Sequence, residues 1–437
     1  MTKDKKSIQI QRPETKAEQS IIAALDIGSS KICCFIAEVK SHGGIEVIGI
    51  GHQASKGVKS GTIVDLRAAE TAVAHAVESA EMMAKDRLQD QPLKSVLVNV
   101  PGMYTLPHQL SVDVKIAGHE VSDRDVQNAL GHSRSVVTAG REELIHVIPA
   151  GYSIDQTRGI QEPRGMIGQT LGVNMTAITG VSSSLRHLTA IAGQNHLELD
   201  GFCSTPYASG LACPVGDELQ LGCTVIDMGG GTTSIAVFLE GKLIYSAAIP
   251  VGGQHVTNDM ARGLTTSLAD AERIKTLYGS AHTVGADDSA SIDVPPIGEE
   301  EHSHPNYVPR SLLTGIIQPR IEETFELVRA KLVDSGINQI AGRRVILTGG
   351  ASQLPGLCDI GQLILDKQIR LGRPQRIKGL AEATGGPAFS TAAGLLIYAA
   401  EHADEMPFTQ PGHTFSLPVP FSSPVLQKVT HWLKENW

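Results

Sequence analysis

The chain has 437 residues and a formal net charge of -9, and this length predicts two lobes, each with its own core. Hydrophobic residues make up 41% and charged residues 19%, which indicates a soluble globular protein, and the negative charge argues against nucleic acid as the main partner. The six cysteines lack the paired spacing of a zinc site, so we expect free thiols in a reducing cytosol.

The first segment, residues 1–19, is polar and contains several lysines. It has no apolar core, so we predict a disordered tail rather than a secretory signal. Nowhere in the sequence do about 20 uninterrupted apolar residues follow one another, so no membrane-spanning helix is expected.

The first motif, Ile21–Lys31, reads IIAALDIGSSK. It predicts a buried strand that ends at an aspartate and turns back into a second strand, Ile32–Val39, with a third at Ile45–Gly51. Glycine and small hydroxyl residues after a strand suit a phosphate-holding turn, so the candidate residues are Asp26, Gly28, Ser29 and Ser30. Lys31 could reach a phosphate oxygen or could be a solvated strand residue. Thr62–Lys85 has helical spacing.

The interval 95–178 is predicted to be an inserted α+β subdomain. Strands are expected at Ser95–Val100, Leu110–Ile116, Leu144–Pro149 and Val173–Gly180. Between the second and third, Ser122 is predicted to cap a helix that runs to about Val137. A further helix is expected at Ser182–Asn195.

The second motif, Cys223–Ser234, reads CTVIDMGGGTTS and repeats the order of the first. Three glycines allow backbone N–H groups to approach an anion. Either motif alone could be an ordinary strand-end turn, but together they suggest two facing half-sites. The candidate residues of this turn are Asp227, Gly229, Gly230, Gly231, Thr232 and Thr233.

Beyond this motif, return strands are predicted at Ile235–Leu239 and Leu243–Pro250. Helices follow from Gly252 to about Ala261, at Asp270–Gly279, and at Leu312–Leu332, where Pro319 predicts a kink. Glu272 and Lys275 stand three residues apart on one face of their helix. A last strand with two glycines, VILTGGA, spans Val345–Ala351.

The duplicated pattern resembles the superfamily of actin, heat-shock chaperones and sugar kinases. This resemblance implies an α/β fold, the actin-like ATPase fold, in which two duplicated ribonuclease-H-like lobes bind ATP and Mg²⁺ between them. Asp26 and Asp227 would hold Mg²⁺ through water, and the two turns would cradle the phosphates. Glu272 and Lys275 would hold the ribose and base, unless they form only a surface ion pair. The adenosine would be flanked by Gly349, Gly350 and Ala351.

Four segments are more narrowly similar to the FtsA family of bacterial cell-division proteins, namely His146–Gly168, Asp227–Val237, Val345–Leu357 and Ser390–Leu396. The resemblance implies subdomain 1A at 20–94 and 179–215, subdomain 1C at 95–178, subdomain 2A at 216–250 and 311–400, and subdomain 2B at 251–310. It further implies that 2B binds the FtsZ tail, that 1C contacts later division proteins, and that the chain self-associates into filaments at the division septum.

Hydrolysis of ATP is expected to be weak at most. In the superfamily, the segment that connects the lobes usually supplies a glutamate or glutamine to orient the attacking water. Here the region holds Ser204, Thr205, Pro206 and Tyr207, with no acidic residue from Gly201 to Gly216.

The end of the chain, 401–424, is rich in proline and polar residues and predicts a flexible linker. Residues 425–437 then predict an amphipathic helix, roughly 20 Å long at about 1.5 Å per residue. Its apolar arc of about 140° consists of Val425, Leu426, Val429, Trp432, Leu433 and Trp437. Both tryptophans of the protein lie on this arc. The helix suits the inner face of the cytoplasmic membrane; docking on the protein's own core is the alternative.

Two other functions remain open from the sequence. A sugar or acid kinase of the same superfamily would need a carboxylate base and a polar sugar pocket, and neither is evident. A pilus-assembly adaptor with the same fold would not require the amphipathic end.

Overall fold

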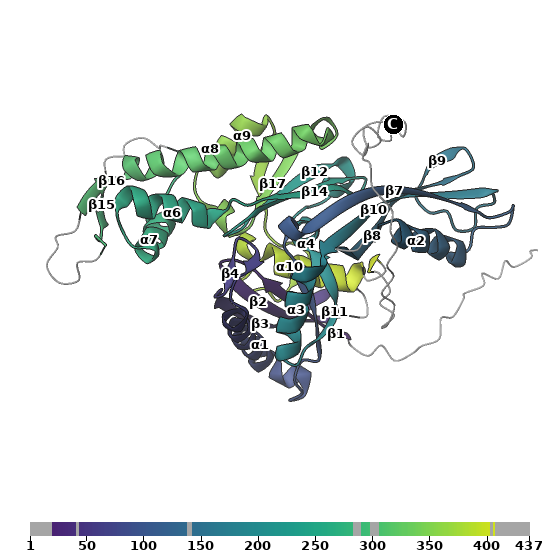
Figure 1. The fold of residues 1–437 in the computed structure, drawn as a ribbon, viewed down its shortest axis with the longest axis horizontal. Coiled ribbons are helices and arrows are strands. Elements are labelled where there is room, and N and C mark those ends of the chain that lie inside the picture. The colour runs from purple at the N-terminus through teal and green to yellow at the C-terminus, as the bar shows by residue number, and fades with distance from the viewer. Residues whose placement is uncertain are drawn as a thin grey trace, which may run out of the picture.

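Two β-sheets of related topology form the centre of the computed structural model (Figure 1). It describes residues 20–40, 43–137, 142–282, 290–297, 306–402 and 405–406. The first sheet has the order β11 (Glu198–Ser204), β6 (Ser95–Val100), β1 (Ser20–Ile27), β2 (Lys31–Val39), β3 (Ile45–Ala54) and β19 (Ile377–Lys378). The second has the order β18 (Gln368–Leu371), β17 (Arg344–Thr348), β12 (Cys223–Met228), β13 (Thr233–Leu239) and β14 (Lys242–Ile249).

The two sheets repeat one arrangement. The strand that ends near an aspartate, β1 or β12, pairs antiparallel with the strand that follows it in sequence. On its other side it pairs in parallel with a strand from much later in the chain, β6 or β17. Strands buried on both faces read as continuous apolar runs, and both central strands do. The predicted duplication of two α/β lobes is confirmed.

Helices cover the first sheet on both sides. The helices α1 (Leu66–Leu88) and α3 (Ser182–Gln194) contact each other and pack on this sheet. Between the two sheets lie α4 (Thr205–Ala212), which contacts β12 and β13, and α10 (Ser390–Glu401), which contacts β1 and β2. These two helices cross so closely that a Cβ atom on Gly394 would lie 1.7 Å from the carbonyl oxygen of Ala208.

The second lobe extends into the arm at the left of Figure 1. Besides its sheet, the second lobe contains α5 (Glu218–Leu221), α6 (Gly253–Leu264), α7 (Leu268–Tyr278), α8 (Arg310–Asp334), α9 (Leu357–Leu365) and the hairpin of β15 (Ser291–Val294) with β16 (Asn306–Pro309). Helix α8 runs unbroken through Pro319. Short 3-10 turns occur at η1 (Gly102–Tyr104), η3 (Ile337–Gln339), η4 (Gly350–Gln353) and η5 (Pro387–Phe389).

The inserted subdomain is a four-stranded antiparallel sheet with one helix. The strand order is β7 (Thr105–Lys115), β10 (Thr170–Val181), β8 (Glu142–Ile154) and β9 (Thr157–Ile160), and the helix is α2 (Asp123–Val137). A separate apolar cluster, which includes Ile116, Val126 and Leu171, forms its core. The α+β character that was predicted is therefore present.

The start of the insert differs from the prediction of residue 95. Strand β6, Ser95–Val100, lies between β1 and β11 in the first sheet, so the insert begins after it. The apolar run SVLVNV predicts a buried strand but says nothing about which sheet it joins, because its parallel partner β1 lies about seventy residues earlier in the chain.

Two other boundaries also differ from the predictions. The helix predicted from Thr62 begins at Leu66, because Asp65 is its N-cap and accepts a hydrogen bond from the N–H of Ala68 at 3.1 Å. Thr62–Ile63 instead form β5, which pairs with β4 (Val58–Lys59) in a small hairpin. The predicted linker starts at 401, yet Glu401 ends α10. Most of the linker, the tail 1–19 and the helix 425–437 lie outside the described residues.

A buried histidine joins the inserted subdomain to the core of the first lobe. The Nε2 atom of His146, on β8, accepts a hydrogen bond from the N–H of Ser204 at 3.0 Å. Its Nδ1 atom therefore carries the proton and donates to the hydroxyl of Tyr398, on α10, at 2.8 Å. The ring of Tyr207 packs edge-on at 5.4 Å, and the Tyr207 hydroxyl donates to Glu405 at 2.8 Å.

This environment makes the histidine a source of acid sensitivity. Burial, with a smaller contribution from the charge of His402, lowers the pKa of His146 from 6.5 to about 3. Below pH 6.5 the unfolded chain binds a proton at this position that the folded chain does not accept. The free energy of unfolding therefore decreases as the pH is lowered from 6.5 to about 3, by about 1.4 kcal/mol per pH unit.

We expect His146→Gln to be less stable than the parent protein at pH 7, and this difference to shrink by about 2 kcal/mol between pH 6.5 and pH 5. Urea unfolding at pH 7, 6 and 5 measures it. His187→Gln, which removes an exposed histidine of α3, is the control and should leave the pH dependence unchanged. Parallel pH curves for the parent and His146→Gln would contradict this explanation.

Candidate functional site

Two hairpin turns of the same geometry face each other between the lobes. In the first, Gly28 donates its N–H to the carbonyl oxygen of Lys31 at 3.0 Å; in the second, Gly229 donates to Thr232 at 2.9 Å. Each turn begins two residues after an aspartate. In the antiparallel pairs, Asp26 lies opposite Cys33 and Asp227 lies opposite Ser234. The repeated sequence order thus corresponds to a repeated structure.

The second turn consists of glycines because the first turn packs directly against it. A Cβ atom on Gly230 would lie 2.8 Å from the Cβ atom of Ser30. A Cβ atom on Gly231 would lie 2.6 Å from the hydroxyl oxygen of Ser29 and 2.7 Å from the Cα atom of Ser60. Close approach of the two turns, as well as any approach to a ligand, therefore requires these glycines.

The third glycine pair meets the second aspartate. Gly349 follows β17 with φ of +87°, and a Cβ atom there would lie 2.3 Å from Oδ1 of Asp227 and 2.5 Å from the carbonyl oxygen of Met228. Only glycine tolerates both the backbone angle and the contact. The VILTGGA motif thus places its first glycine against the carboxylate at the end of β12.

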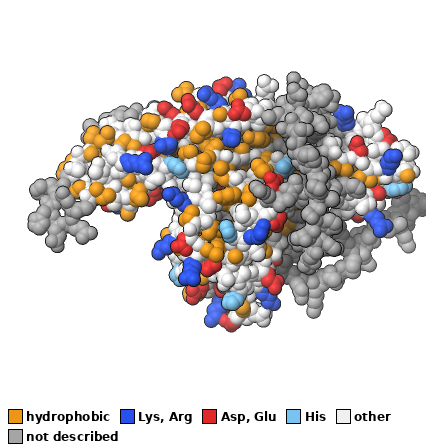
Figure 2. All heavy atoms as spheres, viewed as in Figure 1, with side chains coloured by type: hydrophobic (Ala, Val, Ile, Leu, Met, Phe, Trp, Pro, Cys, Tyr) orange, Lys and Arg blue, Asp and Glu red, His pale blue; other side chains and the backbone are white. Residues whose placement is uncertain are grey.

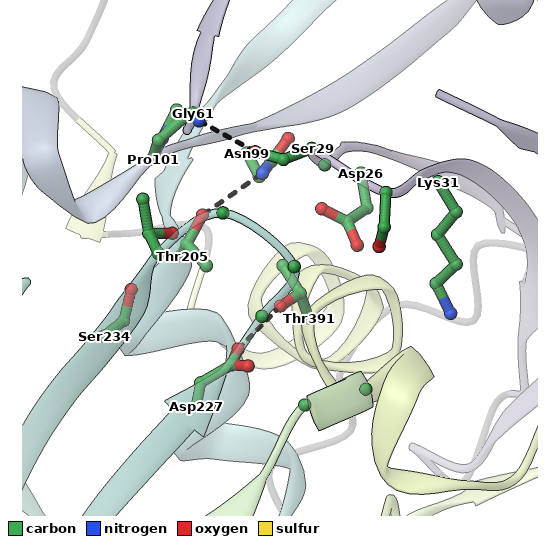
Figure 3. A pocket seen from close by; sticks show the side chains of 18 of the residues that line it. Asp26, Ser29, Lys31, Gly61, Asn99, Pro101, Thr205, Asp227, Ser234 and Thr391 are labelled. Atoms are coloured by element: carbon green, nitrogen blue, oxygen red, sulfur yellow. Dashed lines mark hydrogen bonds between the residues drawn. The ribbon is translucent and has the colours of Figure 1, made fainter. Parts of the chain in front are cut away.

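The two aspartates line one small pocket between the turns, together with Gly349, Gly350 and both loops (Figure 3). Burial raises the pKa of Asp26 to about 7; the charge of Lys31 opposes this rise and that of Asp227 adds to it. Burial also raises the pKa of Asp227, against hydrogen bonds from Thr391 and Ser209 that lower it. Two buried carboxylates without a bound cation are therefore held in an unfavourable environment, which a cation would relieve.

Lys31 also borders this pocket. Its ammonium lies 3.1 Å from the centre of the Phe389 ring, a cation–π contact. Its Nζ atom is buried and has no hydrogen-bond partner among the described residues, and burial lowers its pKa. From the sequence, Lys31 could either contact a phosphate or be solvated. In the structure its ammonium group is buried at the pocket, and no described residue forms an ion pair with it.

A larger cleft opens beside the small pocket and shares Ser29, Ser30, Gly230 and Gly350 with it. Its volume is about 1050 Å³, enough for a nucleotide-sized ligand. Figure 2 shows a notch between the arm of the second lobe and the first lobe, which lies below it in the view. The cleft is lined by β4 on one side and by α6 and α7 on the other.

Glu272 and Lys275 lie on the wall of this larger cleft, as does Ala351. The Nζ atom of Lys275 lies 2.7 Å from Oε2 of Glu272, and it donates to the hydroxyl of Thr257 at 2.8 Å. The ion pair, which was the alternative to a contact with the ribose and base, therefore exists, and it borders the cleft. Thr233 is the one candidate that lines neither pocket, because its hydroxyl donates to the carbonyl oxygen of Val251 at 2.8 Å.

The small pocket suits a hard cation that keeps part of its water shell. Magnesium prefers oxygen ligands and commonly binds through one or two carboxylates and the phosphates of its nucleotide, and Asp26 and Asp227 supply such oxygens. Within the described residues no group of three histidine, cysteine, aspartate or glutamate side chains could hold a metal by itself. The donor set therefore fits a cation that arrives with a phosphate ligand.

Four polar residues of the small pocket were not predicted as site residues, namely Asn99, Thr205, Ser234 and Thr391. Asn99, at the end of β6, accepts a hydrogen bond from the N–H of Ile27 at 2.7 Å and donates one to the hydroxyl of Thr205 at 3.1 Å. Thr391, at the start of α10, donates to Oδ2 of Asp227 at 3.1 Å. Asn99 could have been noticed as the one amide in the otherwise apolar run of its strand. Nothing in the sequence around Thr391 indicates that it lies at the site.

Two family models match this sequence. One, described as "Cell division protein FtsA", matches residues 224–394, and the other, "SHS2 domain inserted in FTSA", matches residues 103–179. The second match begins after β6, in agreement with the corrected start of the inserted subdomain.

Whole-chain relatives carry the same description. The chain is 43% identical over 437 residues to a cell division protein FtsA of Agrobacterium fabrum, with 98% of this chain and 97% of the relative covered. It is 32% identical to the FtsA of Pseudomonas aeruginosa (95% and 98% covered) and 32% identical to that of Escherichia coli K12 (88% and 91%).

Solved structures with similar folds are more distant in sequence. A PilM-PilN type IV pilus biogenesis complex gives a TM-score of 0.61 at 15% identity, with 87% of this chain and 98% of that chain covered. MreB5 of Spiroplasma citri bound to ADP gives 0.52 at 13% identity, with 88% and 97% covered. The expected actin-like ATPase fold with an inserted subdomain is confirmed.

Proposed function

This chain belongs to the FtsA family of cell division proteins, and we propose that it is an ATP-binding scaffold that tethers FtsZ filaments to the membrane. The two facing hairpins with their aspartates carry this proposal. They place backbone N–H groups, hydroxyls and two carboxylates around one pocket that opens into a cleft of nucleotide size.

In this proposal the nucleotide bridges the two lobes. The turns at Gly28–Lys31 and Gly229–Thr232 hold the phosphates through N–H groups and hydroxyls. Gly349 lines the small pocket, Gly350 and Ala351 line the larger cleft where the adenosine would bind, and the Glu272–Lys275 pair would contact the ribose and base. The structure of MreB5 with ADP supports a nucleotide site in this fold.

Mg²⁺ bound with ATP would neutralise phosphate charge between the lobes, and Asp26 and Asp227 would orient it through water. Ionised, the two carboxylates repel each other, and each would gain from a cation nearby. Lys31 would add a positive charge from the first lobe if its ammonium left the Phe389 ring.

We propose that the chain hydrolyses ATP slowly, if at all. The residue of α4 that faces the small pocket is Thr205, a neutral side chain whose hydroxyl accepts a hydrogen bond from Asn99. Neither residue is a base that could take a proton from water near pH 7. The nucleotide would then serve to close the lobes and favour self-association into filaments.

The arm of the second lobe is the proposed contact for the FtsZ tail. Large apolar side chains are exposed on α7, on the β15–β16 hairpin and on the start of α8 (Figure 2). They are Leu268, Leu277, Tyr278, Ile297, Tyr307 and Leu312. Exposed apolar side chains on neighbouring elements favour a protein contact. The inserted subdomain is the proposed contact for later division proteins.

The last thirteen residues are the proposed membrane anchor, on the cytoplasmic face at the division site. No helix in the described part of the chain is long and apolar enough to cross a membrane. Residues 425–437 lie outside that part, and their sequence places both tryptophans on one apolar arc. A single short helix binds weakly, so filaments that array many copies would gain avidity.

Co-sedimentation with liposomes that contain anionic lipids tests the anchor. We expect the intact protein to pellet and a truncation after Pro424 to remain in the supernatant. Trp432→Glu should weaken binding roughly tenfold or more, since it removes a large apolar side chain from the arc. His431→Glu places the same charge on the polar side and should have a smaller effect.

If the truncated protein pellets as well as the intact one, with and without Mg-ATP, the anchor lies elsewhere. If both remain in the supernatant, residues 425–437 do not bind membrane, and a soluble adaptor would be the better description.

A further inference from the structure

The two aspartates of the small pocket differ in how they are held. Asp227 is 7% exposed, and its Oδ2 atom accepts a hydrogen bond from Thr391 at 3.1 Å. Its Oδ1 atom faces Gly349, where a Cβ atom would lie 2.3 Å away. Asp26 is similarly buried, but no described side chain donates a hydrogen bond to its carboxylate. Thus one carboxylate is oriented before any ligand binds, and the other is not.

Thr391 is itself fixed by its surroundings. It lies in the first turn of α10 and is 8% exposed. The neighbouring Ser390 hydroxyl forms a hydrogen bond of 2.6 Å with that of Thr348, at the end of β17, and Thr348 lies directly before Gly349. The start of α10 is therefore held on the strand that carries the glycine, and the Thr391 hydroxyl has little freedom to turn away. Figure 3 shows the hydrogen bond between Thr391 and Asp227.

A carboxylate that orients a metal-bound water must present one oxygen in a set direction. Residues that hydrogen-bond to such groups fix their orientation, and their removal commonly weakens metal binding 10- to 100-fold. The Thr391 hydroxyl holds Oδ2, and because the carboxylate is planar this also sets the direction of Oδ1. We propose that Thr391 is a positioning residue, which orients Asp227 for the cation that accompanies the nucleotide.

This inference rests on the proposed binding of Mg-ATP. The experiment measures the dissociation constant of ATP by calorimetry on the full-length protein, once with excess Mg²⁺ and once with EDTA. The dissociation constant in EDTA divided by that in Mg²⁺ is the ratio that reports how much the cation contributes. Thermal unfolding without nucleotide is recorded for each variant.

We expect Thr391→Val, which keeps the shape of the side chain but removes the hydroxyl, to lower this ratio about tenfold. Affinity for ATP in EDTA should change little. Thr391→Ser keeps the hydroxyl and should restore most of the ratio. Ser390→Ala is the matched control, since it removes a buried hydroxyl from the same turn that does not contact Asp227; it should lower the unfolding temperature and lower the ratio much less than Thr391→Val does.

Two results would overturn the role of Thr391 while leaving the nucleotide site intact. In the first, Thr391→Val keeps the parent ratio. In the second, Ser390→Ala lowers the ratio as much as Thr391→Val does, so that the effect is merely structural. If the parent protein itself binds ATP equally well in Mg²⁺ and in EDTA, or does not bind it, the proposed Mg-ATP site fails, and the role of Thr391 fails with it.

Discussion

Replacing Asp227 with asparagine is expected to weaken the binding of Mg-ATP by 10- to 100-fold and, at the same time, to stabilise the protein without ligand. Asparagine keeps the shape of the side chain and can still accept the hydrogen bond from Thr391, but it carries no charge to orient a cation. The unliganded protein should gain stability because burial raises the pKa of Asp227, which means that the folded state disfavours its ionised form at pH 7.

Calorimetry with Mg-ATP and thermal unfolding without it measure the two effects. Asp359→Asn, the same change at an exposed position of α9, is the control and should alter neither. Opposite signs of the two effects would distinguish a ligand-binding carboxylate from a structural one, whose loss lowers both affinity and stability. Binding of Mg-ATP at the parent affinity would show that the second turn does not hold the cation.

Replacing Gly394 with alanine is expected to destabilise the protein by about 3 kcal/mol or more. The added Cβ atom would lie 1.7 Å from the carbonyl oxygen of Ala208 and 2.3 Å from its carbonyl carbon. These are backbone atoms, which no rotamer change can move, so α4 and α10 would have to separate. Both helices begin at the small pocket, where Thr205 and Thr391 lie, and the substitution should therefore also weaken nucleotide binding.

Urea unfolding measures this prediction, and Gly193→Ala is its control. Gly193 is an exposed helical glycine of α3, and nothing lies within 4 Å of a Cβ atom built there. Alanine at this position should stabilise the helix by about 0.5 to 1 kcal/mol. A loss below about 1 kcal/mol for Gly394→Ala would mean that the two helices can move apart easily and that their crossing does not constrain the core.

Much of the fold could be predicted because the strongest signals are local. The runs that end at Asp26 and Asp227 are continuous apolar strands followed by turn residues, and both the strands and their hairpin partners were found where the sequence placed them. Helix α1 has enough residues for its helical periodicity to show, but it begins four residues later than predicted because Asp65 is its N-cap.

Helix α4 could not be predicted, for a physical reason. All residues from Pro206 to Ala212 are buried, because the helix lies between two sheets and has no face toward water. A short helix without a polar face has no 3.6-residue periodicity, so it reads as a connecting segment. The same limit applies to β6, whose place in the first sheet depends on pairing with a distant strand.

The candidate site was predicted in its loops but not in its supporting side chains. Turn glycines and strand-end aspartates follow from sequence order, since each belongs to one continuous motif. Asn99, Thr205 and Thr391 come from three separate elements that only the folded chain brings to one pocket. Their hydrogen bonds join β6 to α4 and α10 to β12, and no local pattern encodes such pairs.

Helix α10 also imposes a constraint on how the protein can vary. Thr391 bonds to Asp227, and Tyr398, seven residues later, bonds to His146 in the inserted subdomain. Seven residues make nearly two full turns at 3.6 residues per turn, so the two side chains leave the helix in almost the same direction. One inserted or deleted residue between them would turn one contact by about 100° relative to the other. Insertions and deletions in this helix should therefore disrupt the fold even at positions that tolerate substitutions, because no side chain can restore the relative direction of Thr391 and Tyr398.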